Sequence, residues 1–170
     1  MGELGRAIAN AGSKRLLEDL QRAYADEWFA HYNFQFTANS MRGYRAPSLT
    51  SLLARKSADA FRRANRLADR LQELGGRPAA KLTDLQKLAT DKPFKLPSSM
   101  TDVEGVLKAV LDAERTSIRT YHALYEATAA TDPITALLAQ QWLAETVQGE
   151  EELERLLGDS APALDGTADS

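Results

Sequence analysis

The sequence lacks cysteine and has two histidines among its 170 residues. The absence of cysteine excludes disulfide bonds, thiolate metal sites and cysteine nucleophiles, and it fits the reducing cytoplasm, where we expect the protein to reside. No stretch is apolar for long enough to cross a membrane, and the N-terminus has no signal-peptide core, so we expect no membrane association. A Ser-His-Asp arrangement, a phosphate loop and a zinc motif are also missing.

Positive charge is not in excess, because the formal net charge is -3. This balance argues against a body built to bind phosphate backbones. The last twelve residues carry acids and no lysine, so DNA is an unlikely partner on sequence grounds. The hydrophobic fraction of 44% is ordinary for one soluble domain with a single core.

What the sequence does have is helical periodicity, with apolar residues three or four positions apart. We expect four long helices at about 14–41, 48–74, 101–130 and 133–158. Ser48 is the expected cap of the second helix. Gly75-Gly76 followed by Pro78 is a strong stop signal, and Thr101 to Glu104 has the form of a capping box.

The chain divides into a flexible N-terminal arm (1–13), a helical bundle (14–158) and a disordered C-terminal tail (159–170). The connection from 77 to 100 contains a candidate short helix within 81–92. A connection of this length can run the full length of a bundle. The predicted fold is therefore all-α, a four-helix bundle with a long crossover between helices 2 and 3.

Two carboxylates interrupt the apolar stripes. Glu27 occupies a core position of the first helix, and Glu114 occupies one on the third. A buried carboxylate is costly unless it has a metal, a cation or a proton as its partner. Facing glutamates in a bundle are also how di-metal carboxylate centres are built. The alternative is that both acids lie at the solvated rim.

Four segments resemble the bacterioferritin and Dps (starvation-induced DNA-protection) branches of the ferritin-like superfamily. They are AYADEWFAHYNFQ, RLADRLQELGGRP, VLDAERTSIRTYHAL and AETVQGEEELERLL. The resemblance covers about residues 14–158. It implies a ferritin-like four-helix bundle, iron as the cofactor and assembly into a homo-oligomer.

The resemblance also identifies the positions of the usual di-iron ligands. Glu27 and Glu114 match the glutamates of the first and third helices. The two Glu-x-x-His pairs of the family fall on other residues here: Ala60, Arg63, Thr146 and Gly149. Both bridging acids and both histidines are thus replaced, so the resemblance implies a degenerate di-iron site. Whether the protein is an enzyme with ferroxidase activity is left open by these residues.

A second set of candidate ligands surrounds His31. Its Ala-His-Tyr-Asn segment is similar to the Ala-His-Trp-Asn of Dps proteins, whose histidine binds iron across a twofold interface. The family's acidic partners on the second helix fall on Asn65 and Asp69. An interface histidine without metal is the alternative. Phe61 stands where bacterioferritins have the haem-ligating methionine, so no haem is expected.

Three functions remain compatible with these residues. The protein handles iron by a reduced or intersubunit site, with Glu27, Glu114, His31 and Asp69 as metal ligands. Alternatively it is a non-catalytic structural or binding protein in which Arg63 replaces the metal between the two glutamates. Iron is weakly bound in the first case and no cofactor is needed in the second. A third reading is that Arg63 binds an anionic substrate in the emptied centre.

Overall fold

The computed structural model describes residues 2–8, 14–90 and 94–158, and within them every regular element is a helix. Of the arm predicted to be flexible over 1–13, residues 3–8 form a helix, while residues 1 and 9–13, like the predicted tail 159–170, lie outside the described residues. In chain order the helices are α1 (Glu3–Ile8), α2 (Lys14–Ser40), α3 (Ala46–Glu73), α4 (Leu82–Leu88), α5 (Val103–Thr128) and α6 (Pro133–Gly158).

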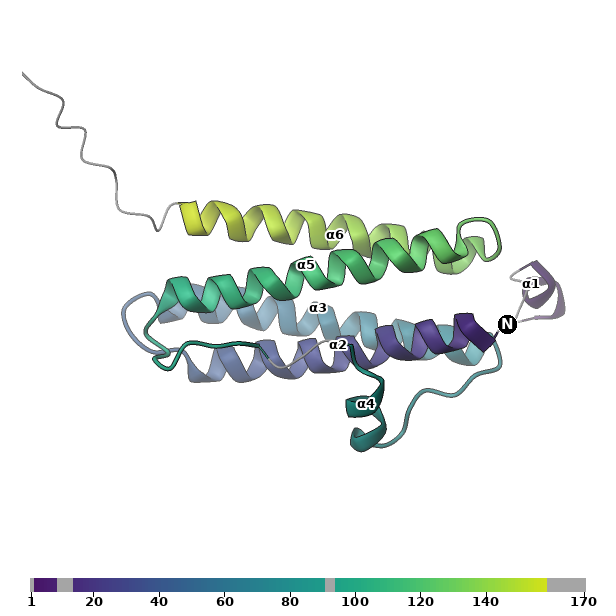
Figure 1. Ribbon diagram of the computed structural model, residues 1–170, viewed down its shortest axis with the longest axis horizontal. Coiled ribbons are helices and arrows are strands. Elements are labelled where there is room, and N and C mark those ends of the chain that lie inside the picture. The colour runs from purple at the N-terminus through teal and green to yellow at the C-terminus, as the bar shows by residue number, and fades with distance from the viewer. Residues whose placement is uncertain (1, 9–13, 91–93, 159–170) are drawn as a thin grey trace, which may run out of the picture.

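The four long helices lie side by side along the molecule (Figure 1). α2 packs against α3, and α5 packs against α6, so the bundle consists of two helical hairpins. The connection between α3 and α5 returns along the bundle and carries α4, which packs on α2. The predicted bundle with its long crossover and its short connecting helix is confirmed.

The helices end close to the expected positions, but two of the predicted caps differ from those observed. α5 is capped by Asp102, whose side chain accepts a hydrogen bond from the Gly105 backbone at 2.9 Å, and not by Thr101, with which the predicted capping box begins. Gly75 has a φ of +84°, a conformation that favours glycine, directly after α3. The prediction that Ser48 caps α3 is wrong, because the helix already begins at Ala46 and takes proline into its first turn. The short helix α1 was not predicted.

The apolar core forms two clusters, one toward each end of the bundle. The first contains Leu16, Leu20, Ala23, Tyr24, Ala25, Ala64, Leu67, Leu71, Leu74, Leu85, Tyr121, Leu124, Ala139 and Trp142. The second contains Ala30, Phe34, Ala38, Met41, Leu49, Leu52, Leu53, Ala60, Val106, Leu107, Val110, Leu111 and Leu153. On each long helix the two sets occupy different halves, so the middle of the bundle is left for other residues.

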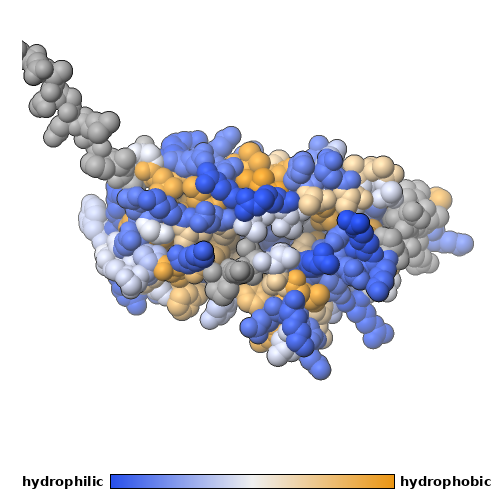
Figure 2. Space-filling model, viewed as in Figure 1, coloured by the Kyte–Doolittle hydropathy of each residue, from blue (hydrophilic) through white to orange (hydrophobic). Residues whose placement is uncertain are grey.

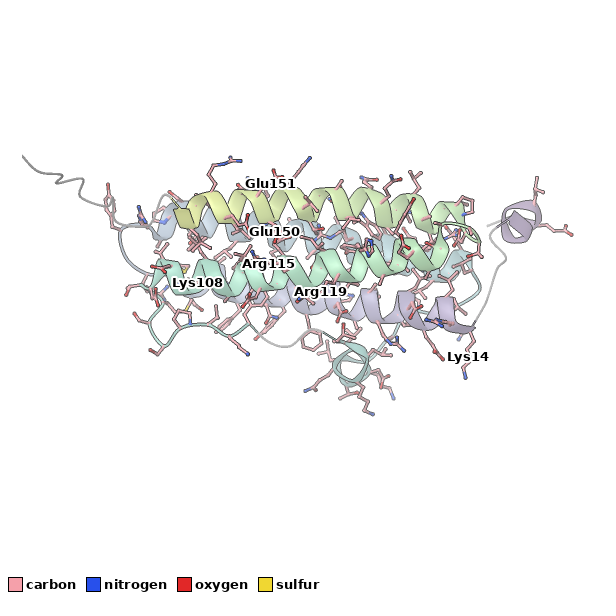
Figure 3. All side chains as sticks on the ribbon, turned by 45° about the horizontal axis from the view of Figure 1, so that its top comes forward. Lys14, Lys108, Arg115, Arg119, Glu150 and Glu151 are labelled. Carbon is pink, nitrogen blue, oxygen red and sulfur yellow. The ribbon has the colours of Figure 1, made fainter. Side chains whose placement is uncertain are left out.

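The outer face is polar and held by ion pairs between helices. Arg115 on α5 donates to Glu150 and Glu154 on α6, each at 2.7 Å, along the seam shown in Figure 3. On the face shown in Figure 2, hydrophilic side chains are interspersed with apolar patches. None of the described helices is long and apolar enough to cross a membrane.

Candidate functional site

A layer of charged side chains separates the two apolar clusters in the middle of the bundle. Its four members are all less than a tenth exposed: Glu27, Lys56, Arg63 and Glu114. Each comes from a core position of α2, α3 or α5, as the helical spacing predicted for Glu27 and Glu114. The alternative that the two glutamates lie at the solvated rim is therefore wrong.

Glu27 has two partners in this layer. Tyr121 donates a short hydrogen bond to one of its carboxylate oxygens, and the Arg63 Nε lies 3.1 Å from the other. Burial raises the pKa of Glu27, and the opposing effects of Arg63 and Tyr121 do not cancel it. Burial acts to lower the pKa of Arg63, but Glu27, Tyr121 and Glu114 together outweigh it and raise the pKa, so the guanidinium stays protonated.

Glu114 is neutralised by a residue that sequence reasoning missed. The Lys56 Nζ lies 2.6 Å from its Oε1, and both side chains are more than nine-tenths buried. Arg63 thus contacts Glu27, whereas Lys56 takes the place beside Glu114. The available signal was the spacing, because Lys56 lies seven residues before Arg63 and thus on the same face of α3.

Gly149 provides the room for this pair. A Cβ atom at that position would lie 2.9 Å from the Lys56 Nζ and 3.1 Å from the Glu114 Oε2. Real Cβ atoms essentially never come as close as the first of these distances. The position that carries a histidine ligand in the family pattern therefore here borders a buried ammonium group. Thr146, one turn earlier, turns its hydroxyl back to the Trp142 carbonyl at 2.9 Å.

A polar cavity of about 300 Å³ opens between α3 and α6 onto this layer. Two half-exposed ion pairs cross its rim: Arg55 with Glu152 at 2.6 Å and Arg62 with Glu145 at 3.0 Å. Lys56, Arg63 and Gly149 form part of its inner wall. The buried charges are therefore reachable from solvent through this opening.

Arg63 has unused hydrogen-bonding capacity at the cavity. Among the described residues it makes no hydrogen bond, because its Nε–H is not aligned with Glu27 and its Nη1 lies 3.7 Å from the nearest oxygen of Glu145. A guanidinium carries five N–H donors. Arg63 is therefore paired with Glu27 by charge, while donors on its cavity side remain available.

The residues of the second candidate set lie apart from the central layer. His31 is half-buried on α2, with its Nδ1 2.8 Å from the Ser57 hydroxyl and its ring 5.1 Å from that of Phe61. Asp69 is exposed on α3. Across residues 2–8, 14–90 and 94–158, no group of three or more His, Cys, Asp or Glu side chains gathers to hold a metal.

The central layer also does not fit the di-metal centre that the resemblance implies. A centre of two divalent ions needs several carboxylate or imidazole ligands with free oxygens or nitrogens. Here the two glutamates at those positions face Arg63 and Lys56. The donor set of this chain is therefore that of an ion-pair cluster.

The comparison with known families identifies the class of protein. A ferritin-like domain matches residues 17–161, and the chain therefore belongs to the ferritin-like family. A curated relative, the DNA protection during starvation protein of Pyrococcus furiosus, is 28% identical over 144 residues, which cover 85% of this chain and 77% of the relative. The resemblance to the Dps-like branch is confirmed.

Solved structures agree. The dodecameric thioferritin of Bacteroides fragilis, a bacterioferritin-related protein, superimposes with a TM-score of 0.84 at 25% identity, covering 93% of this chain and 94% of the other. Dps from Thermosynechococcus elongatus superimposes with a TM-score of 0.78 at 23% identity, covering 91% and 96%. At 23% identity, the similarity to this Dps shows a shared fold alone.

Proposed function

We propose that this protein is a non-catalytic, ferritin-like subunit of a homo-oligomer, in which an ion-pair cluster replaces the di-metal centre. The observation that carries the proposal is the Lys56 ammonium 2.6 Å from Glu114, beside the Arg63 guanidinium 3.1 Å from Glu27. Two fixed positive charges in this layer repel divalent cations and engage the carboxylates that would bind them. Arg63 thus replaces part of the metal charge, and Lys56 supplies the rest.

Assembly is supported by aromatic side chains on the outside of the α2–α3 hairpin. Tyr32, Phe36, Tyr44 and Phe61 are all large and more than 40% exposed, and the rings of Tyr32 and Phe36 stack at 6.3 Å. Exposed aromatic patches of this kind favour burial against another protein surface. A second copy of the chain is the partner we propose, in keeping with the dodecameric assembly named for the Bacteroides fragilis relative.

An anaerobic titration of the assembled protein with Fe(II), followed by air, tests the proposal. We expect no tight iron at the bundle centre, so that Glu114→Ala changes neither the iron retained per chain nor the oxidation rate. Absorbance and bound iron per chain are the readouts. Stoichiometric iron that Glu114→Ala abolishes would contradict the proposal.

An intersubunit iron site around His31 is the second candidate function. Two observations favour it: the Ser57 hydroxyl orients the His31 ring through Nδ1, and the described residues make no hydrogen bond to Nε2. The ring of His31 on α2 packs on Phe61 of α3. Asp69 lies eight residues after Phe61, so these two residues are on one face of α3. In this case fast oxidation is abolished by His31→Ala and reduced by Asp69→Ala, while Glu114→Ala retains it.

DNA protection, the function named for the Pyrococcus furiosus relative, is not part of this proposal. The net charge of -3 and the acidic C-terminal residues weigh against binding of the phosphate backbone. The cytoplasmic location likewise stays a prediction.

A further inference from the structure

The rim of the α3–α6 cavity consists of interactions that open at little cost. Arg55 pairs with Glu152 and Arg62 pairs with Glu145, seven residues apart on both helices. The side chains of Arg62 and Glu145 are 52% and 31% exposed. Exposed ion pairs of this kind contribute little to stability, because water screens the charges and solvates the separated groups. A ligand can therefore compete with them.

The inner wall contains the group that such a ligand would satisfy. The Arg63 side chain is 8% exposed, and its Nε, which lies 3.1 Å from Glu27, makes no hydrogen bond within the described residues. Its fork of donors matches the two oxygens of a carboxylate. The nearest carboxylate on the cavity side is that of Glu145, whose 3.7 Å distance from Nη1 is too long for a hydrogen bond.

We propose that this cavity binds a small carboxylate, which takes the place of Glu145 between Arg62 and Arg63. Glu145 then turns into solvent, so the number of negative charges inside the cavity does not change and binding costs no net desolvated charge. The volume of about 300 Å³ lies at the lower end of the range for small-molecule sites, which suits a compact acid.

α6 leaves space for the ligand in the same region. Gly149 has no side chain, and the hydroxyl of Thr146 is already engaged with its own helix. The spare N–H groups of the Lys56 ammonium lie on the same wall of the cavity. The inference goes beyond the proposed function, since it requires no metal and is unaffected by the result of the iron titration.

Ligand-observed NMR with ¹³C-labelled acetate tests the site in the assembled protein, with chloride added to keep the ionic strength constant. We expect the acetate resonance to broaden in the presence of the wild-type protein. Glu145→Gln should tighten binding roughly fivefold, because an exposed carboxylate no longer competes for the arginines. Arg62→Gln, an exposed substitution that the fold tolerates, should weaken it, and Arg63→Met should abolish it.

Glu152→Gln is the matched control, because it removes the equivalent carboxylate at the other end of the rim, away from Arg63. It should leave acetate binding at the wild-type level. Equal tightening by Glu145→Gln and Glu152→Gln would indicate non-specific attraction and overturn the proposal, as would wild-type binding in Arg62→Gln. Phosphate that displaces acetate with equal affinity would overturn the assignment to carboxylates.

Discussion

Two buried arginines on α3, seven residues apart, have opposite surroundings. Arg70 is fully buried, and its guanidinium donates to Thr135 at 2.9 Å, to Glu73 at 2.7 Å and to both oxygens of Asp132 at 2.8 Å. Arg63 is almost as buried but makes no hydrogen bond within the described part of the chain, and it borders a cavity. The difference teaches that Arg70, with four hydrogen bonds, fixes the fold, whereas Arg63 has donors left for the ligand that we propose.

The Arg70 cluster also explains how the two hairpins are held at one end of the bundle. Asp132 stands at the start of α6, where its carboxylate accepts from the backbone of Ile134 and Thr135 at 3.2 Å. The same carboxylate binds Arg70 from α3. A helix cap and an interhelical ion pair thus share one side chain.

Removal of Arg70 should have the largest effect on stability. Arg70→Met leaves Asp132 buried without its cationic partner, and we expect a loss of about 3–5 kcal/mol in the free energy of unfolding. Arg63→Met should cost clearly less, because Tyr121 still donates to Glu27 and the cavity admits water. Denaturant unfolding of both variants measures the difference. Equal losses of stability in the two variants would show that the different hydrogen bonding of the two arginines has no energetic consequence.

A Cβ atom at position 149 should have an intermediate effect. Gly149→Ala places a methyl group against the Lys56–Glu114 pair, and overpacking of this kind costs about 1–3 kcal/mol. Gly158→Ala is the matched control at the end of the same helix, because nothing lies within 4 Å of a Cβ there. We expect Gly149→Ala to be the less stable variant by thermal unfolding. An equal melting temperature would mean that the ion pair shifts without cost.

The smallest effect is on the pH dependence of stability. Asp132, beside Arg70, and Glu27, beside Arg63, should contribute to it with opposite signs. Burial acts to raise the pKa of Asp132, but hydrogen bonds from Arg70 and Thr135 outweigh it and the pKa lies below its usual value. The pKa of Glu27 is instead raised by burial. A lowered folded-state pKa gives stability that is present above the unfolded-state pKa and is lost as the pH falls through the folded-state value.

The Asp132→Asn variant should therefore lose less stability than the wild type when the pH falls from about 6 to about 3, a range that spans ordinary carboxyl pKa values. The Glu27→Gln variant should lose more stability than the wild type over the same range, because it lacks a carboxylate that takes up a proton in the folded state. Urea unfolding at several pH values measures both slopes. Changes in slope of the same sign in the two variants, each measured against the wild type, would contradict the assignment.

The sequence by itself determined the four long helices and their order, and it placed Glu27 and Glu114 at core positions, with the solvated rim as the alternative. Helical spacing fixes which face of a helix is apolar, so a charged residue on that face is visible without a structure. The long crossover was also predictable, because its prolines and its length exclude a short hairpin turn. The resemblance to the family then identified the positions where ligands are replaced, namely Ala60, Arg63, Thr146 and Gly149.

The tertiary structure alone decided how these charges are paired. Lys56 and Arg70 belong to a run of basic residues on α3, a pattern that is typical of a solvated helix face. Their burial depends on acids contributed by α5 and by the start of α6. The cavity likewise depends on the separation of α3 and α6 and on the missing side chain of Gly149. Periodicity describes one helix at a time, whereas partners and empty space arise from the packing of several.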